Sequence, residues 1–245
     1  MKKALITGAN RSIGLETARQ LLRAGYYVYL GSRDLQKGQQ AVAQLHAEGL
    51  AQVEPVAIDV ADIASIKAAR VAVGQETDVL DVLINNAGIN GGRPQTALGT
   101  DTSVYKQVFE TNVFGVIDVT QAFIDLLRQS PAPRIVNVTS GMASLTLHSD
   151  PTWRFYPNKG AVYHPSKTAL NAYTVMLAYE LRDTPFQVNA VDPGFTASDF
   201  NNHQGTGTIP DAAARLVKAA TAGPDGATGQ FFSDENAPDT GISPW

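Results

Sequence analysis

The chain has 245 residues, a formal net charge of −4 and a hydrophobic fraction of 44%. This length is enough to bury the core of a large α/β domain, and we expect one domain over residues 1–245. The mild acidity gives no reason to expect nucleic acid or an anionic membrane as a partner. Because the chain has no cysteine, disulfides, cysteine-ligated zinc and thiol nucleophiles are excluded. No stretch approaches the ~20 apolar residues of a membrane span, and the first apolar run is too short for a signal peptide, so we expect a cytoplasmic protein.

Short apolar runs alternate with longer segments of helical periodicity along the chain. The predicted strands are residues 4–7, 26–30, 53–58, 79–84, 134–138, 186–191 and 229–232. The predicted helices are residues 13–24, 34–48, 63–76, 102–128, 162–181 and 211–222. The strand runs are continuous rather than alternating, which is typical of strands buried on both faces of a parallel sheet. The pattern predicts a Rossmann-type, doubly wound parallel sheet of about seven strands with helices on both faces, a three-layer sandwich.

A turn from Gly8 to Gly14 separates the first predicted strand from the first predicted helix. Glycine lets a backbone approach a pyrophosphate, and a helix N-terminus offers N–H donors and a positive dipole. The G-x-G-x-x-G fingerprint is not matched, because Asn10 occupies its second glycine position, and no P-loop lysine follows. On their own, these glycines are equally consistent with an ordinary turn.

The end of the second predicted strand bears on the choice between NAD and NADP. An acidic side chain at this place binds a ribose 2′-hydroxyl and repels a 2′-phosphate. This chain instead has Ser32 followed by Arg33, with Arg11 available from the first turn. Each guanidinium can give a phosphate a charge-assisted bond of ~1.5–3 kcal/mol, which favours NADP(H). The alternative is a solvated Arg33 beside an Asp34 that only caps a helix.

Tyr163 and Lys167 lie one turn apart in the predicted helix 162–181, on one face and with Cβ atoms ~5–6 Å apart. Reduction of a carbonyl leaves an alkoxide that needs a proton, and a positioned tyrosine hydroxyl can donate it. Lowering a tyrosine pKa from about 10 to near 7 requires ~4 kcal/mol. A cation about 4 Å away supplies that much at an effective dielectric of ~20. Considered alone, the pair is more commonly explained by a solvated lysine beside a half-buried tyrosine.

Several motifs follow one another at successive predicted strand ends. They are Thr7 to Gly14, Asp59-Val60, Asn85-Asn86-Ala87-Gly88, Asn112 in a long helix, Ser140, Tyr163-x-x-x-Lys167 and Pro193-Gly194. In this order they resemble the short-chain dehydrogenase/reductase family, in its single-domain branch, over nearly the whole chain. The resemblance implies an NADPH-dependent enzyme that reversibly reduces a ketone or aldehyde carbonyl to an alcohol, with a small-molecule substrate.

The resemblance also implies catalytic roles for Asn112, Ser140, Tyr163 and Lys167. Ser140 would bind the carbonyl oxygen, and Tyr163 would donate or accept the proton. Lys167 would bind the nicotinamide ribose and lower the tyrosine pKa, while Asn112 would anchor a water molecule. For Asn112, an ordinary buried amide bonded to backbone is the alternative.

A larger set of residues is implied to bind NADP(H). Asp59 would contact the adenine amino group, residues 86–88 would pack against the adenosine, and residues 193–196 would face the nicotinamide. The full set is Gly8, Asn10, Arg11, Ser12, Ile13, Gly14, Arg33, Asp59, Val60, Asn86, Ala87, Gly88, Tyr163, Lys167, Pro193, Gly194, Phe195 and Thr196. No metal is expected, because His148 and His203 lack a second ligand at metal-binding spacing.

Two departures from the family pattern affect these expectations. Ser12 replaces the middle glycine of the turn, where a Cβ would crowd the cofactor. The loop between Ser140 and Tyr163 is long and resembles the insertion of monomeric carbonyl reductases, so an oligomer is possible but the family's tetramer is in doubt. The aromatic residues of this loop either line a substrate pocket or close a small core of the loop itself.

Tyr156 of the same loop is not expected to be the acid/base, because Gly160 occupies the position where a lysine would be needed. The polar segment 198–208, with Gly205 and Gly207, is the expected mobile lid. Two other functions are considered. An NADP(H)-binding sensor or scaffold would be expected to lose the tyrosine or the lysine. A nucleotide-sugar epimerase or dehydratase would need more than the roughly fifty residues that follow Pro193.

Overall fold

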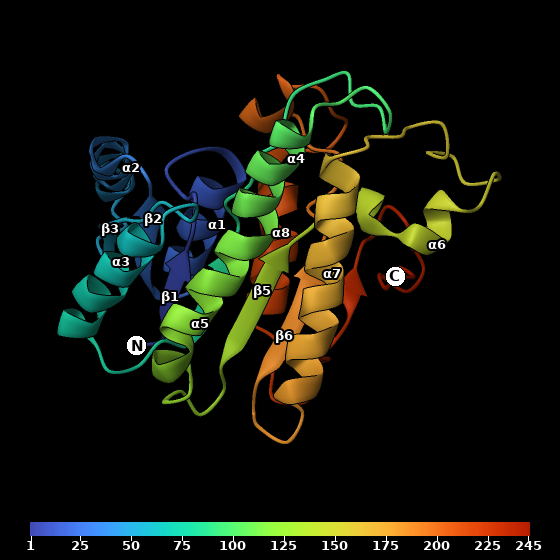
Figure 1. Ribbon diagram of the computed structural model, residues 1–245. Coiled ribbons are helices and arrows are strands. Elements are labelled where there is room, and N and C mark those ends of the chain that lie inside the picture. Colours follow the sequence, from blue (N-terminus) through green and yellow to red (C-terminus); the bar gives the residue numbers. More distant parts are fainter.

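The computed structural model describes residues 1–245, and its seven strands form one parallel sheet in the order β3-β2-β1-β4-β5-β6-β7. The strands are β1 (Lys3–Ile6), β2 (Tyr27–Ser32), β3 (Val53–Ala57), β4 (Val82–Asn85), β5 (Arg134–Val138), β6 (Gln187–Val191) and β7 (Phe231–Phe232). The chain winds outward from β1 in one direction and then from β4 in the other. This is the doubly wound Rossmann-type order, and it confirms the predicted fold (Figure 1).

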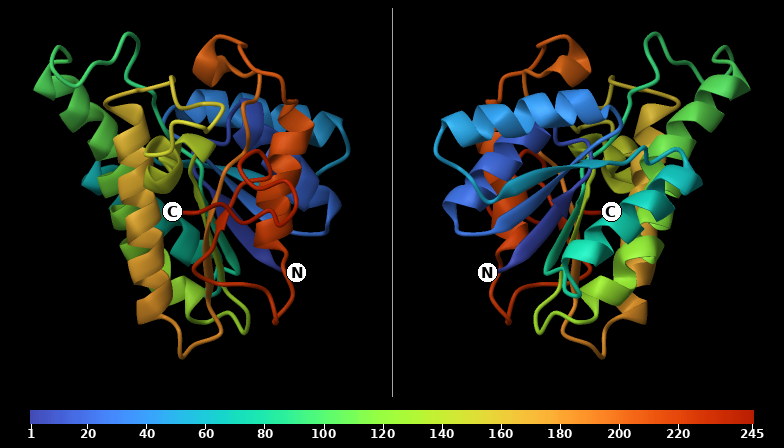
Figure 2. Two further views of the ribbon diagram at one scale, coloured as in Figure 1. Left: turned by 90° about the vertical axis from the view of Figure 1, so that its right-hand side faces the viewer. Right: turned by 90° about the vertical axis from the view of Figure 1, so that its left-hand side faces the viewer.

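Helices cover both faces of the sheet, as the two side views of Figure 2 show. One face carries α1 (Ser12–Arg23), α2 (Leu35–Ala47) and α8 (Ile209–Ala220), whose apolar residues share a buried cluster with strand residues such as Ile6 and Leu30. The other face carries α3 (Ile63–Glu76), α5 (Gly115–Leu127) and α7 (Tyr163–Glu180) around a second cluster that includes Leu5 and Phe123. Neighbouring strand residues Leu5 and Ile6 therefore enter opposite clusters, which explains why the strand sequences are continuously apolar.

Local sequence sets many helix boundaries. Asp34 and Asp62 accept hydrogen bonds from Lys37 N (3.2 Å) and Ala64 N (2.9 Å) and so cap α2 and α3. Gly25, with φ +82°, lies in the left-handed conformation that ends α1. None of the helices combines the length and the apolar character that crossing a bilayer requires.

The prediction of a single helix over residues 102–128 is wrong in one respect. The structure has α4 (Thr102–Phe109), a π-helical turn at Glu110–Phe114, and then α5. Gly115 packs so closely against the loop after β3 that a Cβ at position 115 would stand 2.3 Å from Val60 O. The side chain of Asn112 is bound across the turn to Ile89. These tertiary contacts accompany the extra residue of the π turn, a feature that is frequent at functional sites.

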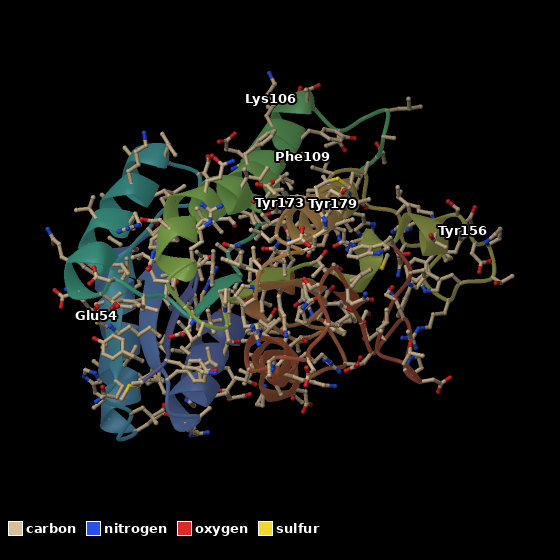
Figure 3. All side chains as sticks on the ribbon, turned by 90° about the horizontal axis from the view of Figure 1, so that it is seen from below. Glu54, Lys106, Phe109, Tyr156, Tyr173 and Tyr179 are labelled. Carbon is tan, nitrogen blue, oxygen red and sulfur yellow. The ribbon has the colours of Figure 1, made fainter.

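The long loop before α7 contains the short helix α6 (Leu145–His148) and a small aromatic core. The His148 ring stacks on His164 of α7 at 5.1 Å, and Trp153 meets His148 edge-on at 5.1 Å. Phe155 meets Trp153 edge-on at 5.4 Å, so these aromatic residues pack on one another. Tyr156 lies at the outer end of the loop in Figure 3. The loop therefore closes a core of its own, the second of the two alternatives considered above.

Candidate active site

The carboxyl ends of the parallel strands meet at one edge of the sheet, and the predicted site residues follow them. Ser140 lies just after β5, Gly88 after β4, and Pro193 after β6, while Tyr163 is the first residue of α7. Ser140 begins a short 3₁₀ turn (Gly141–Ala143), which it caps by accepting a hydrogen bond from Met142 N at 3.2 Å. This edge is where open α/β sheets bind ligands.

Lys167 is a buried cation next to the β5 end. Its side chain is 4% exposed, and Nζ donates a hydrogen bond to Val138 O at 2.8 Å. Burial lowers the pKa of the ammonium to about 8. Nζ lies 6.0 Å from the centre of the Tyr163 ring.

Asn112 holds the loop after β4 against α7. Its Oδ1 accepts from Ile89 N at 2.9 Å, while Nδ2 donates to Ile89 O at 2.9 Å and to Ser166 Oγ at 3.0 Å. Both N–H groups of the side chain are thus used within the protein. A Cβ added at Gly88 would stand 3.3 Å from Asn112 Oδ1 and 3.6 Å from Lys167 Nζ. Gly88, Asn112 and Lys167 therefore lie close together, and a larger residue at position 88 would press against Asn112.

Tyr163 is half-buried at the start of α7. Burial raises the pKa of its hydroxyl above the ordinary value, and the negative charge of Asp192 adds to this effect, while a hydrogen bond with the Ser140 side chain opposes it. The tyrosine is consequently protonated at neutral pH in this structure. A protonated hydroxyl next to a serine hydroxyl can both bind a carbonyl oxygen and donate a proton to it.

Two residues at this site were missed in the sequence. Gln95 Oε1 accepts hydrogen bonds from Val162 N (3.1 Å) and Tyr163 N (3.0 Å), so it caps α7 in place of a local side chain. The Phe200 ring lies 5.4 Å from the Tyr163 ring, centre to centre. Gln95 belongs to an irregular loop and Phe200 to a short 3₁₀ turn (Asp199–Asn201), and no motif or periodicity marks either residue.

The segment expected to be a mobile lid is a closed loop with a hydrogen-bonded stem. Ala197 N donates to Gly207 O at 3.1 Å, and Gly207 N donates to Phe195 O at 2.9 Å. At its tip, Phe200 O accepts a hydrogen bond from Asn90 Nδ2 at 2.6 Å. The lid therefore bridges to the loop after β4 and covers Tyr163 as a compact unit, despite its glycines.

The turn after β1 presents an open helix N-terminus. Gly8 has φ +64° and Ser12 has φ +52°, and the N-cap residue Arg11 gives α1 no side-chain hydrogen bond. In contrast, α2 and α3 are capped by aspartates. The first N–H groups of α1 are thus free to bind an anionic group such as a phosphate.

Other predicted cofactor residues surround this turn. Asn86 Nδ2 donates to Thr7 O at 2.9 Å and to Gly8 O at 3.0 Å, so its side chain fastens the turn to the end of β4. Asp59 is half-buried after β3, and its Oδ1 accepts from Ala61 N at 3.0 Å. Val60 beside it is buried. The structure thus brings residues after β1, β3 and β4 to one edge, as the motifs predicted.

The two arginines proposed for a 2′-phosphate are both exposed. Arg33 lies just after β2 and makes none of the ion pairs of the structure, whereas Asp34 turns toward Lys37 at 3.7 Å. Arg11 makes a long ion pair with Asp199 of the lid, at 3.8 Å, with side-chain exposures of 69% and 38%. An ion pair this exposed is weak, so Arg11 remains available to a phosphate.

Fold and site together define a class: an α/β oxidoreductase with a dinucleotide turn after β1 and a serine, tyrosine and lysine at its active edge. Comparison with known proteins agrees. The model of the short chain dehydrogenase family matches residues 2–208. A short-chain dehydrogenase of Penicillium roqueforti, anuI, is 38% identical over 238 residues, covering 95% of this chain and 94% of that protein. The chain belongs to the short-chain dehydrogenase/reductase family of oxidoreductases.

Solved structures show the same relationship. The salutaridine reductase of Papaver somniferum superposes with a TM-score of 0.82 at 29% identity, covering 96% of this chain and all (100%) of that one. The NADPH-bound carbonyl reductase from chicken fatty liver superposes with a TM-score of 0.84 at 25% identity, covering 100% of this chain and 99% of that one. Reductases of small molecules are therefore among the proteins to which this chain is most similar.

Proposed function

We propose that the chain is an NADP(H)-dependent carbonyl reductase that reversibly reduces a ketone or aldehyde to an alcohol, with Tyr163 as the proton donor. The observation that carries this proposal is that Gly88, Asn112 and Lys167 lie close together, and that Ser140 and Tyr163 are neighbours at the same edge of the sheet. A fold without turnover, serving as a sensor or scaffold, would not need this arrangement.

The residues present suit NADP(H). The uncapped N-terminus of α1 and the left-handed Gly8 would hold the pyrophosphate, and exposed Arg33 and Arg11 would hold the 2′-phosphate. Lys167 would hold the nicotinamide ribose. The carbonyl reductase of known structure is bound to NADPH, which is consistent with this choice. When bound, the nicotinamide supplies the hydride for the carbonyl carbon.

The chain's own residues would orient the substrate and move the proton. Ser140 would donate a hydrogen bond to the carbonyl oxygen, and the protonated Tyr163 hydroxyl would give its proton to the same oxygen as charge develops there. The buried charge of Lys167 would stabilise the tyrosinate that remains. In the direction of alcohol oxidation the same groups act in reverse, with tyrosinate as the base.

The exposed aromatic side chains of the lid favour an apolar substrate. Phe195 and Phe200 are 49% and 38% exposed, which is unusual for large apolar side chains next to a buried polar site. Phe200 lies against Tyr163, so a ring or chain of the substrate would contact it while the carbonyl reaches the tyrosine.

The test is a paired assay of NADPH and NADH oxidation over a panel of aliphatic, cyclic and aryl carbonyl compounds. We expect turnover with NADPH at a kcat/KM at least about tenfold above that with NADH. Tyr163→Phe should remove turnover and leave NADPH affinity intact. Tyr179→Phe is the matched control, because Tyr179 lies on the same helix but is 66% exposed. Full activity of Tyr163→Phe would refute the proton-donor role, and NADPH binding with no turnover on any carbonyl would favour the sensor.

A further inference from the structure

Asp192 is a buried carboxyl group that the family motifs do not single out. It follows β6 directly and precedes the Pro193–Thr196 turn, and it is 3% exposed. No lysine or arginine forms an ion pair with it within 4 Å, because Arg215 pairs with Asp234 instead. A buried carboxyl without a cation partner is costly unless its oxygens are hydrogen-bonded.

The carboxyl group is bonded to three segments that follow three neighbouring strands. Oδ1 accepts from Gly194 N at 2.9 Å, and Oδ2 accepts from Ser233 Oγ, after β7, at 2.7 Å. The backbone N–H of Gly141, after β5, lies close enough to the carboxyl group to lower its pKa. A Cβ on Gly141 would stand 2.9 Å from Oδ2, so only glycine allows this approach.

These contacts fix the peptide that follows Ser140. The N–H of Gly141, which belongs to this peptide, faces Asp192, and the carbonyl of Gly141, in the next peptide, accepts a hydrogen bond from Asn236 Nδ2 at 2.8 Å. The three groups around Asp192 are donors. A carboxylate, which only accepts, therefore satisfies all of them. An amide would turn its N–H groups either toward a backbone N–H or toward Ser233 Oγ, which would then have to accept instead of donate.

The charge of Asp192 also lies near the acid/base, because Asp192 packs against Gly141, the residue after Ser140, and the Ser140 side chain is bonded to Tyr163. Its carboxylate raises the pKa of the Tyr163 hydroxyl, as burial does. The other charged groups near Asp192 are Arg215 of α8, whose Nη1 donates to Pro193 O at 2.7 Å, and Glu235 after β7. Burial raises the pKa of Asp192 itself, and the bonds from Ser233, Gly194 and Gly141 and the charge of Arg215 lower it.

We propose that Asp192 is a positioning residue of this enzyme: it fixes the Ser140–Gly141 peptide relative to the Pro193–Thr196 turn, and it places a negative charge against Tyr163. The inference rests on the proposed function. Asp192 would then be a second group that sets the pKa of Tyr163, and its effect is opposite to that proposed for Lys167. With both present, Tyr163 stays protonated for reduction over a wider pH range than the lysine alone would allow.

The main test compares Asp192→Asn with the control Asp234→Asn, which removes a nearby carboxylate that is bonded to Arg215. In Asp192→Asn we expect kcat to fall about 10- to 100-fold, since small displacements of catalytic groups cost that much, with substrate KM nearly unchanged. The pH midpoint of alcohol oxidation should move down by about 0.5 to 1 unit, because removal of a negative charge favours tyrosinate. A purely structural aspartate would give no shift of the midpoint.

A second variant tests the positioning of the Ser140–Gly141 peptide separately from the charge of Asp192. It also keeps the proposal testable if Asp192→Asn does not fold. Ser233→Ala removes one donor but keeps the carboxylate, so kcat should fall about tenfold without a shift of the pH midpoint. Hydrogen exchange followed by mass spectrometry should show faster exchange at residues 140–143 and 193–196 in both variants, a readout that needs no turnover. If a folded Asp192→Asn or Ser233→Ala protein had the same kcat and the same hydrogen-exchange rates as the wild type, the positioning role of Asp192 would be overturned. Absence of turnover in the wild type would instead count against the proposed function.

Discussion

Substitution of Ser12 measures the backbone strain at the dinucleotide turn. It has φ +52°, in the left-handed region where an L-residue costs about 1–2 kcal/mol relative to glycine. Ser12→Gly should remove that strain. The added freedom of glycine in the unfolded chain costs about 0.5–1 kcal/mol. We therefore expect a net gain of about 0.5–1 kcal/mol in the free energy of unfolding. For a chain of this size the midpoint of thermal unfolding should rise by roughly 1–4 °C.

The assay is thermal unfolding followed by circular dichroism or calorimetry, with Ser12→Ala as the matched control. Alanine keeps the Cβ and its strain but removes the hydroxyl, so it should give no stabilisation. A Ser12→Gly protein that melts at or below the wild-type temperature would refute the strain argument. Stabilisation by both variants would instead show that the hydroxyl, and not the backbone conformation, is unfavourable. NADPH affinity, measured in parallel, reports whether the serine hydroxyl contributes a bond to the cofactor.

Three further predictions concern the cofactor, the lid and pH. Arg33→Glu should weaken NADPH binding about 10- to 100-fold with little effect on NADH, measured as KM for each cofactor; equal losses for both would count against a 2′-phosphate contact. Phe200→Ala should raise KM for cyclic and aryl ketones several-fold and leave small aliphatic aldehydes unaffected, and uniform effects would exclude a substrate contact. Burial lowers the pKa of His164 to about 4, below the ~6.5 of an unfolded chain. The contribution of His164 to the free energy of unfolding should thus be fully present above pH ~6.5. The free energy of unfolding should fall by up to about 3 kcal/mol toward pH 4. His164→Phe should flatten that fall, which urea titrations across this range would detect.

The sheet could be predicted well because its signal is local. Each strand is a short run rich in apolar residues, and several helices begin at a local capping residue such as Asp34 or Asp62. The interruption of the predicted helix 102–128 could not be predicted, because it depends on distant partners. Nothing in the sequence around Gly115 indicates that Val60 will lie against it. The helix-period pattern is the same whether or not a π turn interrupts it.

The same distinction separates the site residues. Ser140, Tyr163 and Lys167 could be proposed as site residues because each occupies a fixed place relative to a predicted strand or helix. Gln95 caps α7 from a loop 67 residues earlier than Val162. Phe200 reaches Tyr163 from a lid whose shape depends on its own hydrogen-bonded stem. Such contacts are set by three-dimensional packing, and spacing in one chain carries no signal for them.

The loop before α7 shows what a departure from the family pattern does to the site. His148 Nε2 lies 2.9 Å from Met142 O, in the turn after Ser140, while the His148 ring stacks on His164, next to Tyr163. Lys159 Nζ donates to His148 O at 2.9 Å and so closes the far end of the loop onto the same histidine. The loop is thus attached beside Ser140 and Tyr163 at once. We therefore expect changes in the loop to affect catalysis through the positions of these two residues.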